Sequence, residues 1–219
     1  GADINEVTNA VGKDERIGEK FLKSGPGFGG SCFKKDILNL IYLCDYYGLD
    51  KVSKYWQQVI EINNWQRERI TNIVVNKLFG TISDKKIAIL GFAFKANTND
   101  TRESPAILIC KDLIEEGGNL RIYDPKVNSK QIEKDLSCIQ NQNNLDKEIG
   151  NWKFVNSIEK ASEDADGIII LTEWDEFKNI NWSKISQKMR KPSWLFDTRL
   201  VSNTNEAKLF GIDVWSLGN

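Results

Sequence analysis

The spacing of apolar residues divides the chain into two parts with different periods. Up to about residue 80 apolar positions recur every three to four residues, which predicts helices. We expect short helices over Asp3–Val11 and Glu15–Leu22, a helix that follows a glycine-rich loop and ends at Gly48, and a long helix over Lys51–Lys77. Such a long helix is typical of a spine between domains or a dimer seam, with ordinary core packing as the simpler alternative.

After residue 80 short apolar runs alternate with helical patterns, which predicts a parallel sheet with helical crossovers. Because the runs are continuously apolar, the sheet is expected to be covered on both faces. We predict an α/β chain with a helical region over residues 1–80 and a Rossmann-like domain over residues 81–219. The expected strands are Lys86–Leu90, Leu120–Tyr123, Gly167–Leu171 and Trp194–Phe196; the expected helices are Pro105–Glu116, Ser129–Leu136, Ile158–Asp164 and Trp174–Lys178; the polar stretch Cys138–Gly150 is expected to be a surface loop.

Composition narrows the class of protein. The 219 residues are 40% hydrophobic and 28% charged, with a net charge of −1, which indicates a globular protein without a drive toward nucleic acid or anionic membranes. Four widely spaced cysteines and the lack of a signal sequence favour the reducing cytoplasm. With no histidine in these residues, acid–base chemistry falls to Asp, Glu, Lys or Cys, and no metal site is predicted.

The stretch GFGGSCFKKD (Gly27–Asp36) carries the strongest local signal of chemistry. Ser31 is a good N-cap, which predicts that Cys32 lies in the first turn of a helix, where the helix dipole favours a thiolate. Asp36 lies one turn further on the same face. The pair suits a nucleophile with a proton-transfer partner, and the simpler alternative is a tight turn before a helix that starts with a cysteine.

A second group of candidates follows the predicted strands, at the edge where open parallel sheets bind ligands. Gly91–Ala106 lacks the G-x-G-x-x-G pattern but offers Lys95 and Arg102 before a helix that Ser104 is expected to cap. Such a loop suits an anion such as phosphate, with solvated surface cations as the alternative. Arg199 follows a later strand at the same edge.

Three other polar or aromatic residues at this edge have structural interpretations. Asp124 ends the second strand, where a ribose-binding acid is common, but Asp-Pro more often forms a turn, which we favour. For Glu173 and Trp174 we favour capping and packing of the next helix.

In order and spacing, six motifs of this chain resemble the UDP-glucose-oxidising members of the UDP-glucose/GDP-mannose dehydrogenase family, over essentially its whole length. The motifs are GFGGSCFKKD, YWQQVIEIN (Tyr55–Asn63), KIAILGFAFKANTNDTRES (Lys86–Ser104), YDP (Tyr123–Pro125), TEWDEF (Thr172–Phe177) and FDTR (Phe196–Arg199). The resemblance implies that the Rossmann-like domain binds UDP and that the long helix is the seam of a homodimer.

The activity implied by the resemblance is oxidation of UDP-glucose to UDP-glucuronate by two NAD⁺. Cys32 would be the nucleophile that forms a thioester, and Asp36 would position or activate the water that hydrolyses it. Arg16 would contact substrate in the neighbouring subunit. The other implied ligands of the substrate are Lys23, Gly25, Pro26, Gly27, Phe28, Gly29, Phe94, Lys95 and Arg199; those implied for NAD are Cys32, Phe33, Lys34, Lys35 and Arg102.

The family's glycine fingerprint for NAD is absent from these residues. The resemblance therefore implies a carboxy-terminal portion, inactive alone, with the main NAD site elsewhere in the protein. Two alternatives stay open: a non-catalytic nucleotide-binding and dimerisation module, and a dehydrogenase of another nucleotide sugar, such as GDP-mannose or a UDP-N-acetylhexosamine. No nucleic-acid or membrane partner is expected.

Overall fold

The computed structural model of the protein describes residues 2–137 and 149–218. The predicted loop Cys138–Gly150 lies largely outside these residues and stays a prediction. The described helices are α1 (Ile4–Val11), α2 (Phe33–Tyr46), α3 (Asp50–Lys77), α4 (Pro105–Glu115), α5 (Ser129–Leu136), α6 (Ile158–Ser162), α7 (Trp182–Ser186) and α8 (Thr204–Leu209), with a 3₁₀ helix η2 (Asp175–Asn179); the strands are β1 (Lys86–Leu90), β2 (Asn119–Tyr123), β3 (Trp152–Phe154), β4 (Gly167–Ile170), β5 (Ser193–Asp197) and β6 (Ile212–Ser216).

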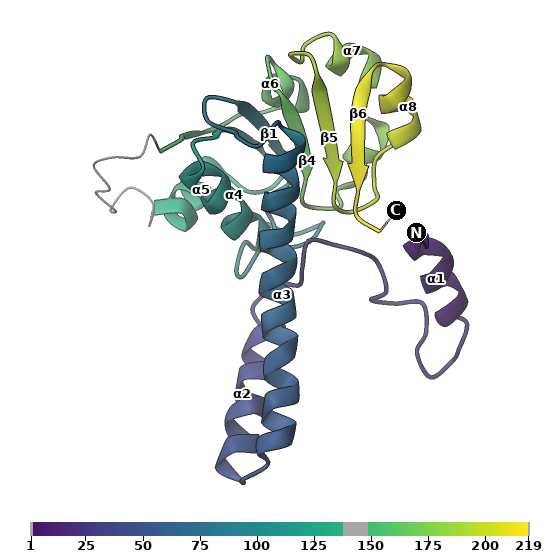
Figure 1. The fold of residues 1–219 in the computed structure, drawn as a ribbon, viewed down its shortest axis with the longest axis vertical. Helices are drawn as coiled ribbons and strands as arrows, with labels where there is room; N and C mark the ends of the chain where they lie inside the picture. The colour runs from purple at the N-terminus through teal and green to yellow at the C-terminus, as the bar shows by residue number, and fades with distance from the viewer. Residues whose placement is uncertain (1, 138–148, 219) are drawn as a thin grey trace.

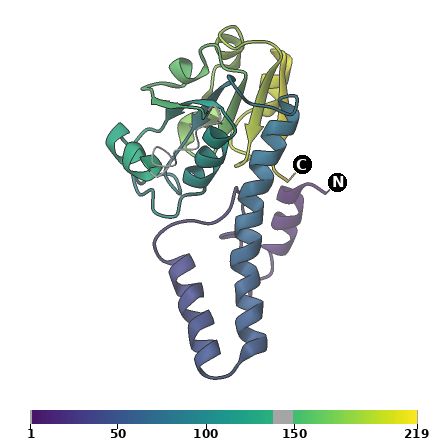
Figure 2. The same cartoon turned by 60° about the vertical axis from the view of Figure 1, so that its left-hand side comes forward.

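The long helix predicted from periodicity is confirmed as α3, which forms an antiparallel hairpin with α2 (Figures 1 and 2). The hairpin projects away from the sheet, and its far end is exposed. The carboxy-terminal part of α3 instead lies against the sheet domain, where Ile70, Val74 and Leu78 are fully buried in the main core. One helix therefore joins the two parts of the molecule.

The helix predicted over Glu15–Leu22 is wrong. This stretch consists of turns, with the amides of Ile17 and Gly18 donating to the carbonyl of Asp14. Gly18 has φ +74°, a left-handed conformation that stops a helix from continuing. Residues 12–24, which we call the arm, lead from α1 to the glycine-rich loop.

Among the described residues, six parallel strands form one sheet in the order β3-β2-β1-β4-β5-β6. β1 and β4 are apolar and almost wholly buried, as expected for a sheet covered on both faces. The predicted Rossmann-like domain is confirmed, but β3, β6, α7 and α8 were not expected. The helix predicted over Trp174–Lys178 is the 3₁₀ helix η2, and the one predicted to Asp164 ends at Ser162.

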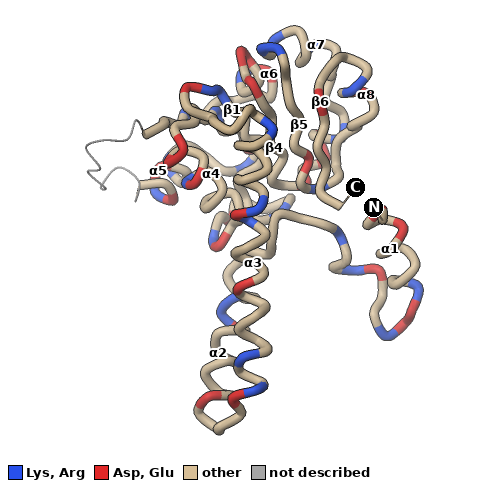
Figure 3. The backbone as a smooth tube through the Cα atoms, viewed as in Figure 1, with Lys and Arg blue, Asp and Glu red and all other residues tan. Residues whose placement is uncertain are grey.

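The two ends of the described chain lie close together, because the amide of Ile4 donates to the carbonyl of Gly218 (3.0 Å). Figure 3 shows acidic and basic segments interspersed over the hairpin and the sheet domain. None of the helices in the described ranges combines the length and apolarity needed to cross a membrane.

Candidate functional site

The sheet reverses its strand order between β1 and β4, so the loops that follow these two strands lie at the switch point where open parallel sheets bind ligands. The loop after β1 is fixed by the buried carboxylate of Asp124. Its Oδ2 accepts hydrogen bonds from the amides of Phe92 (2.7 Å) and Ala93 (3.0 Å) and from the indole of Trp174 (3.2 Å). Asp124 is 3% exposed, and its Oδ1 accepts from the amides of Lys126 (2.8 Å) and Val127 (2.9 Å), which confirms the turn interpretation.

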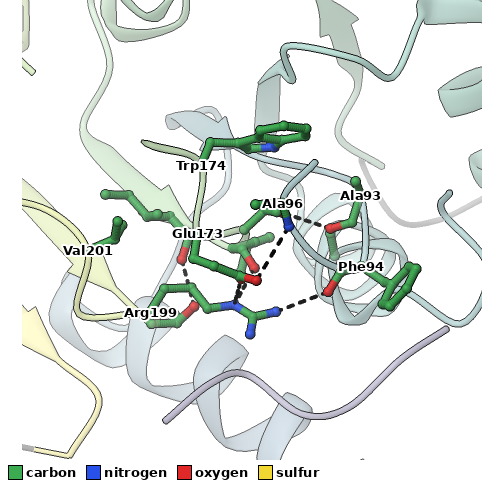
Figure 4. A network of polar contacts seen from close by, with 12 residues as sticks. Ala93, Phe94, Ala96, Glu173, Trp174, Arg199 and Val201 are labelled. Carbon is green, nitrogen blue, oxygen red and sulfur yellow. Dashed lines mark hydrogen bonds and ion pairs between the residues drawn. The ribbon is translucent and has the colours of Figure 1, made fainter. Parts of the chain in front are cut away.

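Arg199 lies at this switch point in a network of polar contacts (Figure 4). Its Nε donates to the carbonyl of Leu171 (2.8 Å) and lies 3.3 Å from Glu173 Oε2, and its Nη2 lies 3.4 Å from the carbonyl of Phe94. Burial lowers the pKa of Arg199, while the neighbouring carboxylate of Glu173 raises it. A guanidinium stays charged under these influences, so the site presents a held positive charge.

Glu173 ties the two loops together, since its Oε1 also accepts from the amide of Ala96 (3.4 Å). The predicted capping role of Glu173 is therefore wrong: η2 begins without a side-chain cap, and the carboxylate is drawn instead to the buried cation of Arg199. The packing interpretation of Trp174 is confirmed, because its side chain is 5% exposed within the core.

The rest of the loop after β1 carries two exposed cations. Lys95 Nζ lies 5.4 Å above the ring of Phe94, and Arg102 pairs with Asp100 (2.7 Å). Ser104 ends the loop as the predicted cap of α4: its Oγ accepts from the amide two residues on (3.3 Å) and donates to a carbonyl of the loop (2.8 Å). The cap is thus confirmed, and it anchors a loop that presents an exposed lysine and an arginine paired with Asp100.

The glycine-rich loop of residues 25–30 packs directly against these groups. The amide of Gly30 donates to the carbonyl of Arg102 (2.9 Å). A Cβ atom on Gly25 would lie 2.8 Å from Arg199 Nη1, and one on Gly29 would collide with the carbonyl of Glu103. The glycines are therefore required here because the backbone itself approaches the sheet domain.

Cys32 follows this loop and is exposed, with its Sγ 3.6 Å from Ser31 Oγ. It occupies the N-cap of α2 itself, without a side-chain capping bond, so the prediction that Ser31 caps the helix is wrong by one residue. The hydroxyl of Ser31 faces the thiol instead. Asp36 lies in the first turn, its amide donating to the carbonyl of Cys32 (2.9 Å).

Arg102 belongs to the loop that accepts the backbone hydrogen bond of Gly30, two residues before Cys32. Its pKa is raised chiefly by the hydrogen bonds to Asp100, and to a smaller extent by the thiolate of Cys32. Lys34, in the first turn of α2, pairs with Glu103 of the same loop (2.8 Å). The structure thus places the thiol, a carboxylate and cations on two adjoining segments, which suits nucleophilic chemistry on a bound anionic substrate.

Two predicted substrate ligands lie on the exposed arm. Arg16 lies on the arm with its side chain 88% exposed, paired only with Asp14 (2.6 Å). Lys23 is exposed near η2, where it adds weakly to the effect of Lys178 in lowering the pKa of Asp175. The remaining predicted residues sit in or beside the glycine loop and α2: Pro26 is buried, the rings of Phe28 and Phe33 are 4.8 Å apart, and Lys35 is exposed.

The sequence patterns assigned no role to the side chains of α3 that bond to the backbone of the glycine-rich loop. Asn63, Gln66 and Arg67 of α3 donate or accept hydrogen bonds with the glycine-loop backbone. Polar residues at this helical spacing on a buried face are a signal that could have found them. Within residues 2–137 and 149–218, no group of carboxylates or cysteines is arranged to hold a metal ion.

Comparison with known proteins adds independent information. Residues 88–204 match the UDP-binding domain of the UDP-glucose/GDP-mannose dehydrogenase family, and residues 1–65 match its central domain. The chain is 48% identical to UDP-glucose 6-dehydrogenase 2 of Arabidopsis thaliana and 47% identical to UDP-glucose 6-dehydrogenase of Gallus gallus, with 100% of this chain and 47% and 44% of those proteins covered. The chain therefore spans about half the length of these relatives.

Among solved structures, the UDP-glucose dehydrogenase of Pyrobaculum islandicum superposes with a TM-score of 0.76 at 25% identity, covering 98% of this chain and 43% of that one. The likeness extends over both the hairpin and the sheet domain.

Proposed function

Because the chain belongs to the UDP-glucose/GDP-mannose dehydrogenase family, we propose that it forms the UDP-sugar-binding, cysteine-bearing half of an enzyme that oxidises UDP-glucose to UDP-glucuronate. One observation supports this most directly. The glycine loop, the loop after β1 and Arg199 meet at the switch point of the sheet, with Cys32 beside them.

The UDP moiety is proposed to bind across this junction. The guanidinium of Arg199 and the ammonium of Lys95 attract the diphosphate, and Phe94 offers a ring face beside them. The backbone of residues 25–29 and Lys23 hold the sugar end. Two carbonyls and a carboxylate already hold the side chain of Arg199 in place. Binding of the diphosphate to Arg199 therefore costs little conformational entropy of that side chain.

Cys32 is proposed as the nucleophile of the second oxidation. Its sulfur adds to the C6 aldehyde, loss of hydride from the adduct leaves a thioester, and water cleaves the thioester to a carboxylate and a free thiol. Asp36, one turn along α2, holds or deprotonates that water. NAD⁺, when bound, accepts one hydride at each of the two oxidations.

The exposed guanidinium of Arg102, held by Asp100 beside the thiol, fits an anionic group of that cofactor. Phe33, Lys34 and Lys35 would complete this side of the cofactor site. The main cofactor site is proposed to lie outside these 219 residues, since no glycine fingerprint occurs in them.

A homodimer in the cytoplasm is also proposed. The dimer is supported by the many large apolar side chains that the α2–α3 hairpin exposes. They include Leu38, Tyr42, Tyr46, Val52, Tyr55, Ile62 and Trp65. The same features suit the alternative of a non-catalytic nucleotide-binding and dimerisation module.

Titration calorimetry with UDP tests the proposal. We expect the chain to bind UDP, and Arg199→Lys to weaken binding about tenfold or more because lysine cannot reproduce the fixed fork. Arg190→Lys, an exposed arginine away from the switch point, serves as the matched control. Failure of the unaltered chain to bind millimolar UDP would contradict the proposal. Titrations with GDP and UDP-N-acetylglucosamine test the alternative sugars.

An absorbance assay for NADH tests whether these 219 residues catalyse the oxidation by themselves or are only part of the enzyme. We expect the 219 residues to form no NADH from UDP-glucose and NAD⁺. Measurable Cys32-dependent turnover would show that the cofactor site is complete within this chain.

A further inference from the structure

Asn63, midway along α3, makes an unusual contact with the glycine loop. Its side chain is 6% exposed, and its amide pairs with both main-chain groups of one residue. Phe28 N donates to Asn63 Oδ1 (2.8 Å), and Asn63 Nδ2 donates to Phe28 O (3.2 Å). A side-chain amide that satisfies both groups of one loop residue fixes the position and the register of that residue.

Two further residues of the same helical face support this contact. Gln66 Nε2 donates to the carbonyl of Gly25 (3.3 Å), and Arg67 Nη2 lies 3.5 Å from the carbonyl of Phe28. Arg67 is 3% exposed; burial lowers its pKa, and the carboxylate of Glu103 partly opposes that effect. At positions i, i+3 and i+4, the three side chains form one polar stripe along the buried side of α3.

The loop conformation is fitted to this stripe. Gly27 has φ +127°, and a Cβ atom there would lie 2.8 Å from Asn63 Oδ1. On the opposite side, the amide of Gly30 bonds the backbone of the loop to the sheet domain at the carbonyl of Arg102. The stripe therefore provides more of the loop's hydrogen bonds than the sheet domain does.

We propose that Asn63 is a positioning residue, which sets the register of the glycine loop against the loop after β1 and thereby the place of Cys32. Cys32 lies only four positions after Phe28, so a displacement of Phe28 would also displace Cys32. The proposed consequence for catalysis rests on the proposed role of Cys32 as nucleophile. The register claim itself stands on the contacts of Asn63 alone.

Amide hydrogen exchange, resolved by residue with NMR, tests the claim on the 219-residue chain. Three amides report on it: Phe28 N, which Asn63 binds directly; Gly30 N, which registers the loop against Arg102; and Asp36 N, which depends on the place of Cys32. Asn63→Leu keeps the side-chain volume and removes both hydrogen bonds. We expect it to speed exchange at all three amides about tenfold or more.

Two further variants separate positioning from packing. Asn63→Asp keeps the acceptor for Phe28 N beside the cation of Arg67, so Phe28 should stay protected. Asn64→Leu, at the exposed neighbouring position, should change none of the three amides. If Gly30 and Asp36 keep their protection in Asn63→Leu, the sheet domain sets the register and the proposal is wrong.

Equal exchange in Asn63→Leu and Asn63→Asp would also overturn it, because a packing role alone would explain that result. If Asn63→Leu proves too unstable to fold, Asn63→Ala, which also removes both hydrogen bonds but adds no bulk, is judged by the same amides. Faster exchange at Phe28, Gly30 and Asp36 supports the proposal, and unchanged exchange at Gly30 and Asp36 overturns it. Calorimetry with UDP on the unaltered chain reports on the proposed function separately. Loss of UDP binding there, with the exchange pattern as expected, would contradict the function and leave the positioning role standing.

Discussion

The carboxyl edge of the sheet and the arm of residues 12–24 both carry predicted ligands, but the fold holds them very differently. At the edge, Asp124 is buried and Arg199 is largely buried, with 14% of its side chain exposed, and both are bonded to backbone groups from several loops. On the arm, Arg16 and Lys23 are exposed, and Phe21 is fully exposed. The predicted ligand-binding side chains at the edge are therefore held in place before a ligand binds. Those on the arm become fixed only when another segment or molecule packs on the arm.

The glycine loop lies between these two extremes. It has few buried side chains of its own, yet its backbone is held by α3 on one side and by the loop after β1 on the other. Tertiary contacts of the main chain therefore assemble this part of the site. Its stability depends on α3 and on the loop after β1 together.

Asp124→Ala should produce the largest effect on the edge. The change removes an acceptor used by four amides, those of Phe92, Ala93, Lys126 and Val127, and leaves them without a partner in the core. We expect a loss of about 3–4 kcal/mol in the free energy of unfolding, measured by urea denaturation. Asp45→Ala, which removes an exposed carboxylate on α2, is the control. Equal losses in both variants would show that the edge is not specially held.

Much of the edge could be predicted from the sequence, because its signals are local. Apolar runs give the strands, Ser104-Pro105 gives the start of α4, and Asp-Pro gives the turn at Asp124. Each depends on residues within a few positions of one another. The short strand β3 and the edge strand β6 were missed, since three or five residues with mixed burial carry little periodicity.

The candidate site was predicted less completely, for a physical reason. Cys32 and Arg199 were found by their motifs, but what joins them is contact across more than 150 residues of chain, and no local pattern encodes it. The carbonyl of Glu103 acts through the main chain, so its residue type gave no clue, whereas the polar spacing of Asn63, Gln66 and Arg67 was a signal that went unused. On the arm, the helix predicted over Glu15–Leu22 failed because periodicity was weighed above Gly18.

Gly29→Ala tests the glycine loop against the arm. A Cβ atom at Gly29 would collide with the carbonyl of Glu103, whereas a Cβ atom at Gly18 would meet open space. We expect Gly29→Ala to lower the free energy of unfolding by about 2 kcal/mol and to weaken UDP-glucose binding, as measured by urea denaturation and calorimetry. Gly18→Ala carries only the cost of its positive φ, so it should leave binding unchanged. If the Gly29→Ala variant binds UDP-glucose as tightly as the unaltered chain, the close contact between Gly29 and the carbonyl of Glu103 is not kept when the ligand is bound.

Asp112→Asn tests the seam where α3 meets α4 and the hairpin joins the sheet domain. Burial raises the pKa of Asp112 to about 6, partly offset by the hydrogen bond from Thr71, and the nearby carboxylates Glu115, Glu68 and Glu116 raise it further. Below about pH 4 the carboxyl is neutral in both the folded and unfolded states. As pH rises from about 4 to about 6, the unfolded chain ionises this carboxyl while the folded chain keeps it protonated, so stability falls over this range and is level above it.

Asn keeps the acceptor for Thr71 without that charge. We therefore expect Asp112→Asn to stabilise the chain by about 1 kcal/mol at pH 8 and by nothing near pH 4, measured by urea denaturation at both values. Asp213→Asn, at an exposed position, controls for a general change in net charge. A gain that is equal at the two pH values would mean that the carboxyl of Asp112 is not perturbed by the seam.

Arg16→Ala should have the smallest effect on the isolated chain. Its side chain contacts only Asp14 of the same turn, so thermal unfolding should shift by less than about 1 °C. Under the proposed homodimer, however, the arm acts on the neighbouring copy. Calorimetry with UDP-glucose at two protein concentrations separates these roles. Arg16→Ala should weaken binding only where sedimentation shows a dimer, and Lys13→Ala, its exposed neighbour, should not. Weaker binding at every concentration would instead mean that the arm folds onto the site of its own chain, and the contrast between a preorganised edge and an uncovered arm would no longer hold once ligand is present.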